Sequence, residues 1–241
     1  MVDNINDELA KAITGNKIDY NYIAELMEKG ADPLGILENG YDTSIDKLFC
    51  IGHEKWSYKD KNGRHRGCYS ERFPKIMSLL IEKGFDCSRF KATEDGNRCL
   101  ELWSLTFSIS RGACETLQIM IENGLEIAAI EDFIGHFYMD SEMCDGSNVD
   151  SRYKKYLTWA FKMIMLCASY PHILDGSEYL RNCIEIENND NEYDMKKFRN
   201  YDNYLYRFDY STMDNIPYGV RNAGVEIIEK ETNKVVWKMY V

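Results

Sequence analysis

One pattern of apolar and polar positions occurs three times in the first half of the chain. It reads YIAELMEKGAD from Tyr22 to Asp32, IMSLLIEKGFD from Ile76 to Asp86 and TLQIMIENGLE from Thr116 to Glu126. Apolar residues recur three and four positions apart, which places them on one face of a helix. Each copy then carries a glycine, and glycine closes a last helical turn in the left-handed conformation without steric cost. The pattern predicts three equivalent helices that end at Gly30, Gly84 and Gly124.

Apolar spacing predicts partner helices before the first two copies, at Asp7 to Ile13 and at Ile45 to Ile51. Thr43 or Ser44 can cap the second of these, and Asn39-Gly40 just before it favours a tight turn. Each partner helix and its copy would form a helix hairpin. In the second hairpin the two helices are separated by an insertion at residues 54–70.

Two further helices are predicted at Ile130 to Met139 and at Arg152 to Tyr170, and we interpret them as a fourth, atypical hairpin. The second contains the strongly apolar run from Trp159 to Tyr170. This run includes Lys162 and falls short of the roughly twenty residues that span a bilayer. It therefore predicts a buried core helix.

The hydrophobic period changes to two near the end of the chain. Alternating or β-branched runs extend over Tyr204 to Tyr210, Val225 to Lys230 and Lys234 to Val241, and Asn233 can take a positive φ between the last two. These runs predict a three-stranded antiparallel sheet. We expect a mainly α fold with a helical region at residues 1–174 and a small α+β region, which caps it, at residues 175–241.

The third copy of the pattern also carries a family resemblance. The stretch WSLTFSISRGACETLQIMIENGLEI, from Trp103 to Ile127, resembles the ankyrin repeat pattern TPLHLAARNGHLEVVKLLLEAGADV without a gap. Its core and turn positions are held by Leu105, Gly112, Glu115, Met120, Ile121 and Gly124. The repeat glycines lie 54 and 40 residues apart, whereas the family period is about 33. The resemblance implies a degenerate ankyrin-like solenoid of helix hairpins that binds other proteins.

Net charge narrows the class of partner. The chain has 40 acidic and 29 basic residues, a net charge of -11, which disfavours nucleic acids and anionic membranes and favours a protein with a basic surface. The start MVDNINDELAKAI lacks the basic residues and apolar run of a signal peptide, and the eight cysteines are scattered. We therefore expect reduced thiols and a cytoplasmic location.

The insertion offers a candidate metal site. Cys50-x-x-His53 and His65-x-x-Cys68 flank it, and two thiolates with two imidazoles suit tetrahedral zinc. A bound ion would also offset the entropy of ordering a long loop. In the alternative interpretation, Cys50 packs in the core and the histidines are solvated.

The insertion also offers a candidate binding surface. Trp56 and Tyr58 lie close to Arg64 and Arg66, and aromatic residues and arginine carry much of the binding energy at protein interfaces. We expect these four residues to contact a partner. Alternatively, Trp56 folds back on the repeats.

Recognisable catalytic signatures are missing from the sequence, which has no serine elbow, phosphate-binding glycine loop or HExxH motif. We expect no catalytic residue and no cofactor. The sequence predicts a non-enzymatic protein that binds a basic protein partner, and one such binder would be an immunity or antitoxin protein. The alternative is a zinc sensor or an enzyme built on the segment from Cys50 to Cys68.

Overall fold

The computed structural model describes residues 4–54, 69–90, 102, 104–105, 108–126, 151–178, 180–181, 194–209 and 224–240. Over these ranges the chain is mainly helical, with a small three-stranded antiparallel sheet near the C-terminus, as predicted. The chain divides into two compact units, Met1–Ala129 and Ile130–Val241. The predicted helix at residues 130–139 lies outside the described residues.

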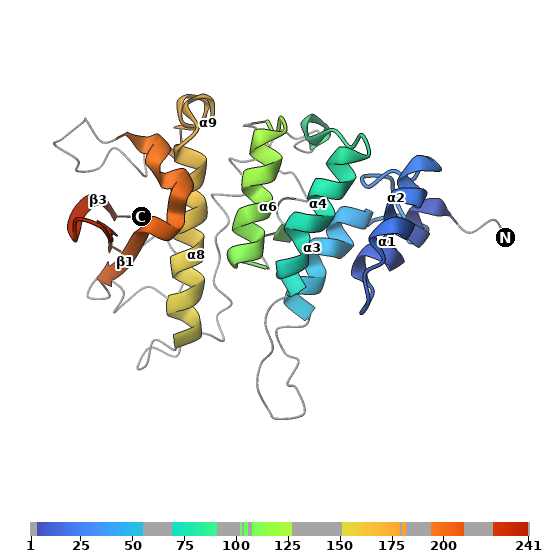
Figure 1. The fold of residues 1–241 in the computed structure, drawn as a ribbon, viewed down its shortest axis with the longest axis horizontal. Helices are drawn as coiled ribbons and strands as arrows, with labels where there is room; N and C mark the ends of the chain where they lie inside the picture. Colours follow the sequence, from blue (N-terminus) through green and yellow to red (C-terminus); the bar gives the residue numbers. More distant parts are fainter. Residues whose placement is uncertain are drawn as a thin grey trace. The chain divides into compact units, whose positions relative to one another are not determined.

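The first unit consists of packed helices (Figure 1). They are α1 (Ile5–Thr14), α2 (Tyr20–Glu28), α3 (Ser44–Glu54), η1 (Tyr69–Arg72), α4 (Phe73–Glu82), η2 (Cys87–Arg89) and α6 (Arg111–Glu122). Helix α1 packs against α2 and α3, α2 packs against α4, and α4 packs against α6. Corresponding helices of the predicted hairpins are thus neighbours along the unit.

The three copies of the sequence pattern end in the same way. Gly30, Gly84 and Gly124 have φ values of 95°, 95° and 93°. Each glycine N–H donates to the carbonyl three residues earlier, and the next N–H donates to the carbonyl five residues earlier, which is the Schellman arrangement. The residues that follow the glycines, Ala31, Phe85 and Leu125, are buried. The predicted glycine caps are therefore confirmed.

Polar contacts join the first hairpin to the second. Arg72 donates to the carbonyl oxygens of Gly15 at 2.9 Å and of Asn16 at 3.0 Å, at the end of α1. Further contacts are a cation–π contact of Lys75 with Tyr20 and the ion pairs Lys83–Glu28 and Arg89–Asp32. In the core, the Phe49 and Phe73 rings lie 5.5 Å apart.

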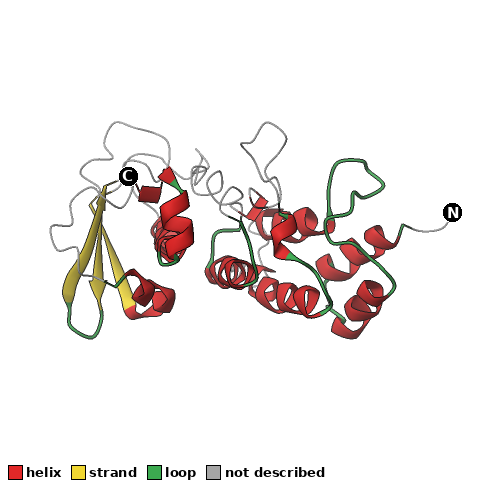
Figure 2. Cartoon of the chain, turned by 90° about the horizontal axis from the view of Figure 1, so that it is seen from above, coloured by secondary structure: helices red, strands yellow, loops and turns green. Residues whose placement is uncertain are grey.

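The second unit combines helices with the sheet. It contains α8 (Ser151–Ala168), α9 (Pro171–Gly176), η4 (Met195–Asn203), β1 (Tyr204–Asp209), β2 (Gly224–Glu229) and β3 (Lys234–Tyr240). The three strands form one sheet (Figure 2). Their order is β1-β2-β3, both pairs are antiparallel, and Ile227 of β2 pairs with Tyr206 of β1 and Trp237 of β3. Asn233, between β2 and β3, has a φ of 54°. The predicted sheet and its turn residue are confirmed.

Helix α8 packs with the C-terminal elements of its unit. Its residues 160–168 are all buried, as expected for a core helix. Phe161 contacts Phe208 of β1, with ring centroids 5.6 Å apart, and Trp159 contacts Tyr201 of η4 at 5.8 Å. From the sequence we placed α8 with the repeats and the boundary between residues 174 and 175, whereas the contacts group α8 with the sheet. A helix that is apolar over most of its surface does not show by its pattern which neighbour covers it.

Within the described residues, none of the helices combines the length and the apolar character needed to cross a lipid bilayer.

Candidate functional site

Most of the site residues that we predicted from the sequence lie outside the described residues. These are Trp56, Tyr58, Arg64, His65, Arg66 and Cys68. The partner contact and the zinc site at the insertion therefore stay predictions.

Two of the predicted zinc ligands lie on α3. Cys50 and His53 are three positions apart on this helix, and the structure describes the side chain of Cys50 only. That thiol is partly buried, and burial raises its pKa. Among the described residues, no three His, Cys, Asp or Glu side chains are grouped so that they could hold a metal ion.

The described residues offer a different candidate, the loop of residues 31–43 that joins α2 to α3. Its first half is fixed to α1 through Asn6, whose Oδ1 accepts a hydrogen bond from the Asp32 N–H at 2.8 Å. A Cβ on Gly35 would lie 2.2 Å from Asn6 Nδ2, so a larger residue at position 35 would force the Asn6 side chain to shift. Leu37 is buried and anchors the middle of the loop.

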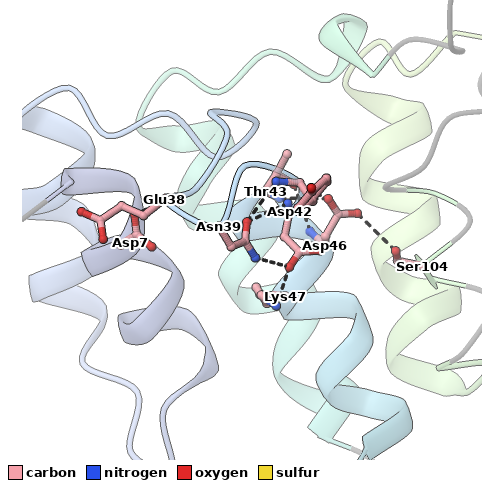
Figure 3. Close-up of polar contacts among 9 residues, drawn as sticks. Asp7, Glu38, Asn39, Asp42, Thr43, Asp46, Lys47 and Ser104 are labelled. Carbon is pink, nitrogen blue, oxygen red and sulfur yellow. Dashed lines mark hydrogen bonds and ion pairs between the residues drawn. The ribbon is translucent and has the colours of Figure 1, made fainter.

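The tip of this loop is held by hydrogen bonds. Asn39 Oδ1 accepts from the N–H groups of Tyr41 and Asp42, both at 3.1 Å, while the Gly40 N–H donates to the Leu37 carbonyl at 2.9 Å. Gly40 has a φ of 80°, a conformation that suits glycine. The Asp42 carboxylate also pairs with Lys47 of α3, at 2.6 Å. The tight turn predicted at Asn39-Gly40 is thus present and is held from several sides (Figure 3).

The end of the loop forms a capping box at the start of α3. Thr43 Oγ1 accepts from the Asp46 N–H at 3.1 Å, and Asp46 Oδ2 accepts from the N–H and hydroxyl of Thr43, both at 3.0 Å. The other carboxylate oxygen of Asp46 accepts from Ser104 Oγ at 3.2 Å, and Figure 3 shows Asp46 directed toward this residue. All three residues are buried, so the loop enters α3 in one fixed direction.

Two large apolar side chains of the loop face solvent. Tyr41 is 85% exposed and Ile36 is 55% exposed. The Leu37 N–H donates to the Asp42 carbonyl at 2.9 Å, which places the segments that carry Ile36 and Tyr41 side by side. The sequence predicted the turn but not this exposure, although the position of Tyr41 directly after Asn39-Gly40 was a usable signal.

The same loop carries three carboxylates, and a fourth, that of Asp7 in α1, contacts its backbone. Two of them are neutralised: Arg89 beside Asp32 and Lys47 beside Asp42 lower the pKa of each carboxyl, mainly by hydrogen bonds. Glu38 and Asp7 have no cationic partner among the described residues, and the Glu38 N–H donates to Asp7 Oδ2 at 3.1 Å. The two side chains lie next to each other in Figure 3. The loop thus carries both exposed apolar groups and carboxylates without a cationic partner in the described part of the chain.

The second unit contains a cationic group among aromatic rings. Lys162 is 7% exposed, and its Nζ lies 4.2 Å from the ring centroid of Trp159 and 3.5 Å from the Asp202 carboxylate. The ring centroid of Tyr201 lies 5.4 Å from the same Nζ. The two rings and the carboxylate provide the Lys162 ammonium with interactions inside the fold. We therefore assign this cluster a role in packing.

Comparisons with protein-family models, with curated protein sequences and with solved structures found no match to this chain.

Proposed function

We propose that this chain is an ankyrin-like solenoid of helix hairpins whose function is to bind another protein with a basic surface. The observation that carries the proposal is the repetition of one helix-and-cap unit at α2, α4 and α6, with each of these helices packed against the next. Arrays in which a hairpin contacts mainly its neighbours have extended surfaces, and their usual role is binding.

Charge supports the choice of partner. Residues 4–54 carry ten acidic and four basic side chains and so contribute -6 of the net charge of -11. More than half of the excess negative charge thus lies in about a fifth of the chain. A negative field of this kind speeds the encounter with a positively charged surface and disfavours polyanions such as nucleic acids.

Co-purification tests the proposal. The full chain, tagged at one end, is isolated from the cells that make it, and native mass spectrometry then reports its bound proteins and metals together. We expect a stoichiometric protein with a basic surface whose binding to the purified chain weakens as salt rises. A chain that carries no protein would overturn the proposal, and a chain that carries one zinc ion instead would favour the site at Cys50, His53, His65 and Cys68.

A further inference from the structure

We infer that Tyr41 and Ile36 form the docking surface for an arginine- or lysine-bearing segment of the protein partner, and that Glu38 and Asp7 pair with the charge of that segment. The inference rests on the proposed function and names the surface that performs it. It follows from exposure, from the rigidity of the loop and from charge.

The exposure of Tyr41 does not serve folding. A side chain that is 85% exposed buries little apolar area, so it adds little to the stability of the fold. The described residues include few large apolar side chains that are exposed, namely Tyr22, Ile36, Tyr41, Leu205 and Val235. Tyr41 is the most exposed of them and Ile36 the next, and both belong to the one short loop.

The backbone beneath Tyr41 is already ordered. Asn39 accepts the N–H groups of Tyr41 and Asp42, Lys47 holds Asp42, and Asp7 accepts the Glu38 N–H. A partner that contacts this loop therefore does not have to order its backbone, which removes one of the main costs of binding. Tyrosine on a rigid support also loses little side-chain entropy when it is buried at an interface.

The charge around the tip selects the chemistry of the partner. No lysine or arginine lies between Lys29 and Lys47, and the carboxylates of Glu38 and Asp7 have no cationic partner in the described part of the chain. A guanidinium or ammonium group can lie over the Tyr41 ring, and such a group can also pair with the Glu38 carboxylate of the same loop. An apolar side chain next to that cation would cover Ile36. The surface therefore fits a basic protein segment that also carries apolar residues.

A random-peptide display library selected on the wild-type full chain tests the surface without knowledge of the natural partner. We expect the enriched peptides to carry arginine or lysine next to apolar residues. The affinity of the synthesised peptides should fall about ten-fold for Tyr41→Ala and about three-fold for Glu38→Gln. Tyr41→Phe keeps the ring and should retain the affinity within about two-fold.

A matched control lies in the other unit. Leu205 is 51% exposed, and Leu205→Ala should leave peptide affinity unchanged. Circular dichroism and the Tm of each variant verify that the fold persists. Enriched peptides without basic residues, or equal affinities of wild type and Tyr41→Ala, would overturn the inference.

The natural partner separates this inference from the proposed function. The protein found by co-purification is titrated against the same variants. Equal binding to wild type and to Tyr41→Ala would overturn the docking surface and leave the proposed function standing. Failure to find any protein partner would overturn both.

Discussion

Arg89 binds Asp32 through two parallel hydrogen bonds. Its terminal nitrogens donate to the two carboxylate oxygens, at 2.9 and 2.7 Å. Asp32 lies two residues after Gly30, which ends α2, and Arg89 lies in η2, which follows α4, so the pair joins two successive hairpins. Asp86, the residue equivalent to Asp32 in the next copy of the pattern, accepts the Ser88 N–H at 2.9 Å, as Asp32 accepts the Leu34 N–H at 3.1 Å.

This ion pair makes a part of the stability depend on pH. Hydrogen bonds from Arg89 lower the pKa of Asp32 below its ordinary value of 3.8, so the contribution is complete above about pH 4 and is lost as the pH falls further. At neutral pH, Asp32→Asn should lower the free energy of unfolding by about 0.5–1 kcal/mol, because the pair is partly exposed. Urea denaturation at pH 7 and pH 3 should show this difference shrinking in acid. A difference that stays constant would contradict the assignment.

The glycine caps predict a graded cost of substitution. A Cβ on Gly84 would meet nothing within 4 Å, so only its φ of 95° opposes a side chain. Gly84→Ala should cost about 1 kcal/mol of unfolding free energy. Gly84→Asn should cost less than Gly84→Val, because asparagine tolerates the left-handed region and a β-branched residue does not. Thermal denaturation of the three variants would measure the order, and equal Tm values would refute the argument.

The capping box at α3 predicts a large effect of a single carboxylate. Asp46→Ala leaves the N–H and hydroxyl of Thr43 and the hydroxyl of Ser104 buried without this acceptor, which should cost about 2 kcal/mol. The matched control is Asp42→Ala in the same loop, whose exposed pair with Lys47 is worth less than about 1 kcal/mol. Urea denaturation of both variants compares them, and a larger loss for Asp42→Ala would contradict the geometry.

The buried cysteines should be inert in the folded chain. Cys87, Cys114 and Cys167 are buried, and burial raises the pKa of Cys87 to about 12. Because the thiolate is the form that reacts, iodoacetamide at mildly alkaline pH should label these three only after denaturation. Peptide mapping by mass spectrometry gives the extent at each site, with the partly buried Cys50 as an internal comparison. Rapid labelling of Cys87 in the native protein would show that its surroundings open.

Local rules predicted the parts of this fold that depend on neighbouring residues. The glycines at the helix ends and Asn233 between two strands have the positive φ values that their types favour. The strands were found because alternating apolar positions have no other regular explanation. Thr43 or Ser44 was predicted to cap α3 because a hydroxyl before an apolar helix has that role, and the structure shows Thr43 in it.

Contacts between distant positions were not predicted. Arg89 lies 57 positions from Asp32, and neither residue carries a local sign of the other. The grouping of α8 with the sheet depends on which surface covers it, and the apolar pattern does not encode that choice. The exposure of Tyr41 was not predicted either, because the exposure of a residue depends on the whole fold around it. The insertion at residues 54–70 lies largely outside the described residues, so its binding surface stays a prediction.

The hydrogen bonds of Asn39 also affect how fast this residue deamidates. In an Asn-Gly pair, the glycine nitrogen can attack the side-chain amide and form a succinimide, which opens to aspartate or isoaspartate. Here the Gly40 N–H is engaged by the Leu37 carbonyl, and the Asn39 amide bonds to its neighbours at both ends. The fold thus holds both reactants away from the geometry of attack, so we expect deamidation at this pair to be slow until the chain unfolds.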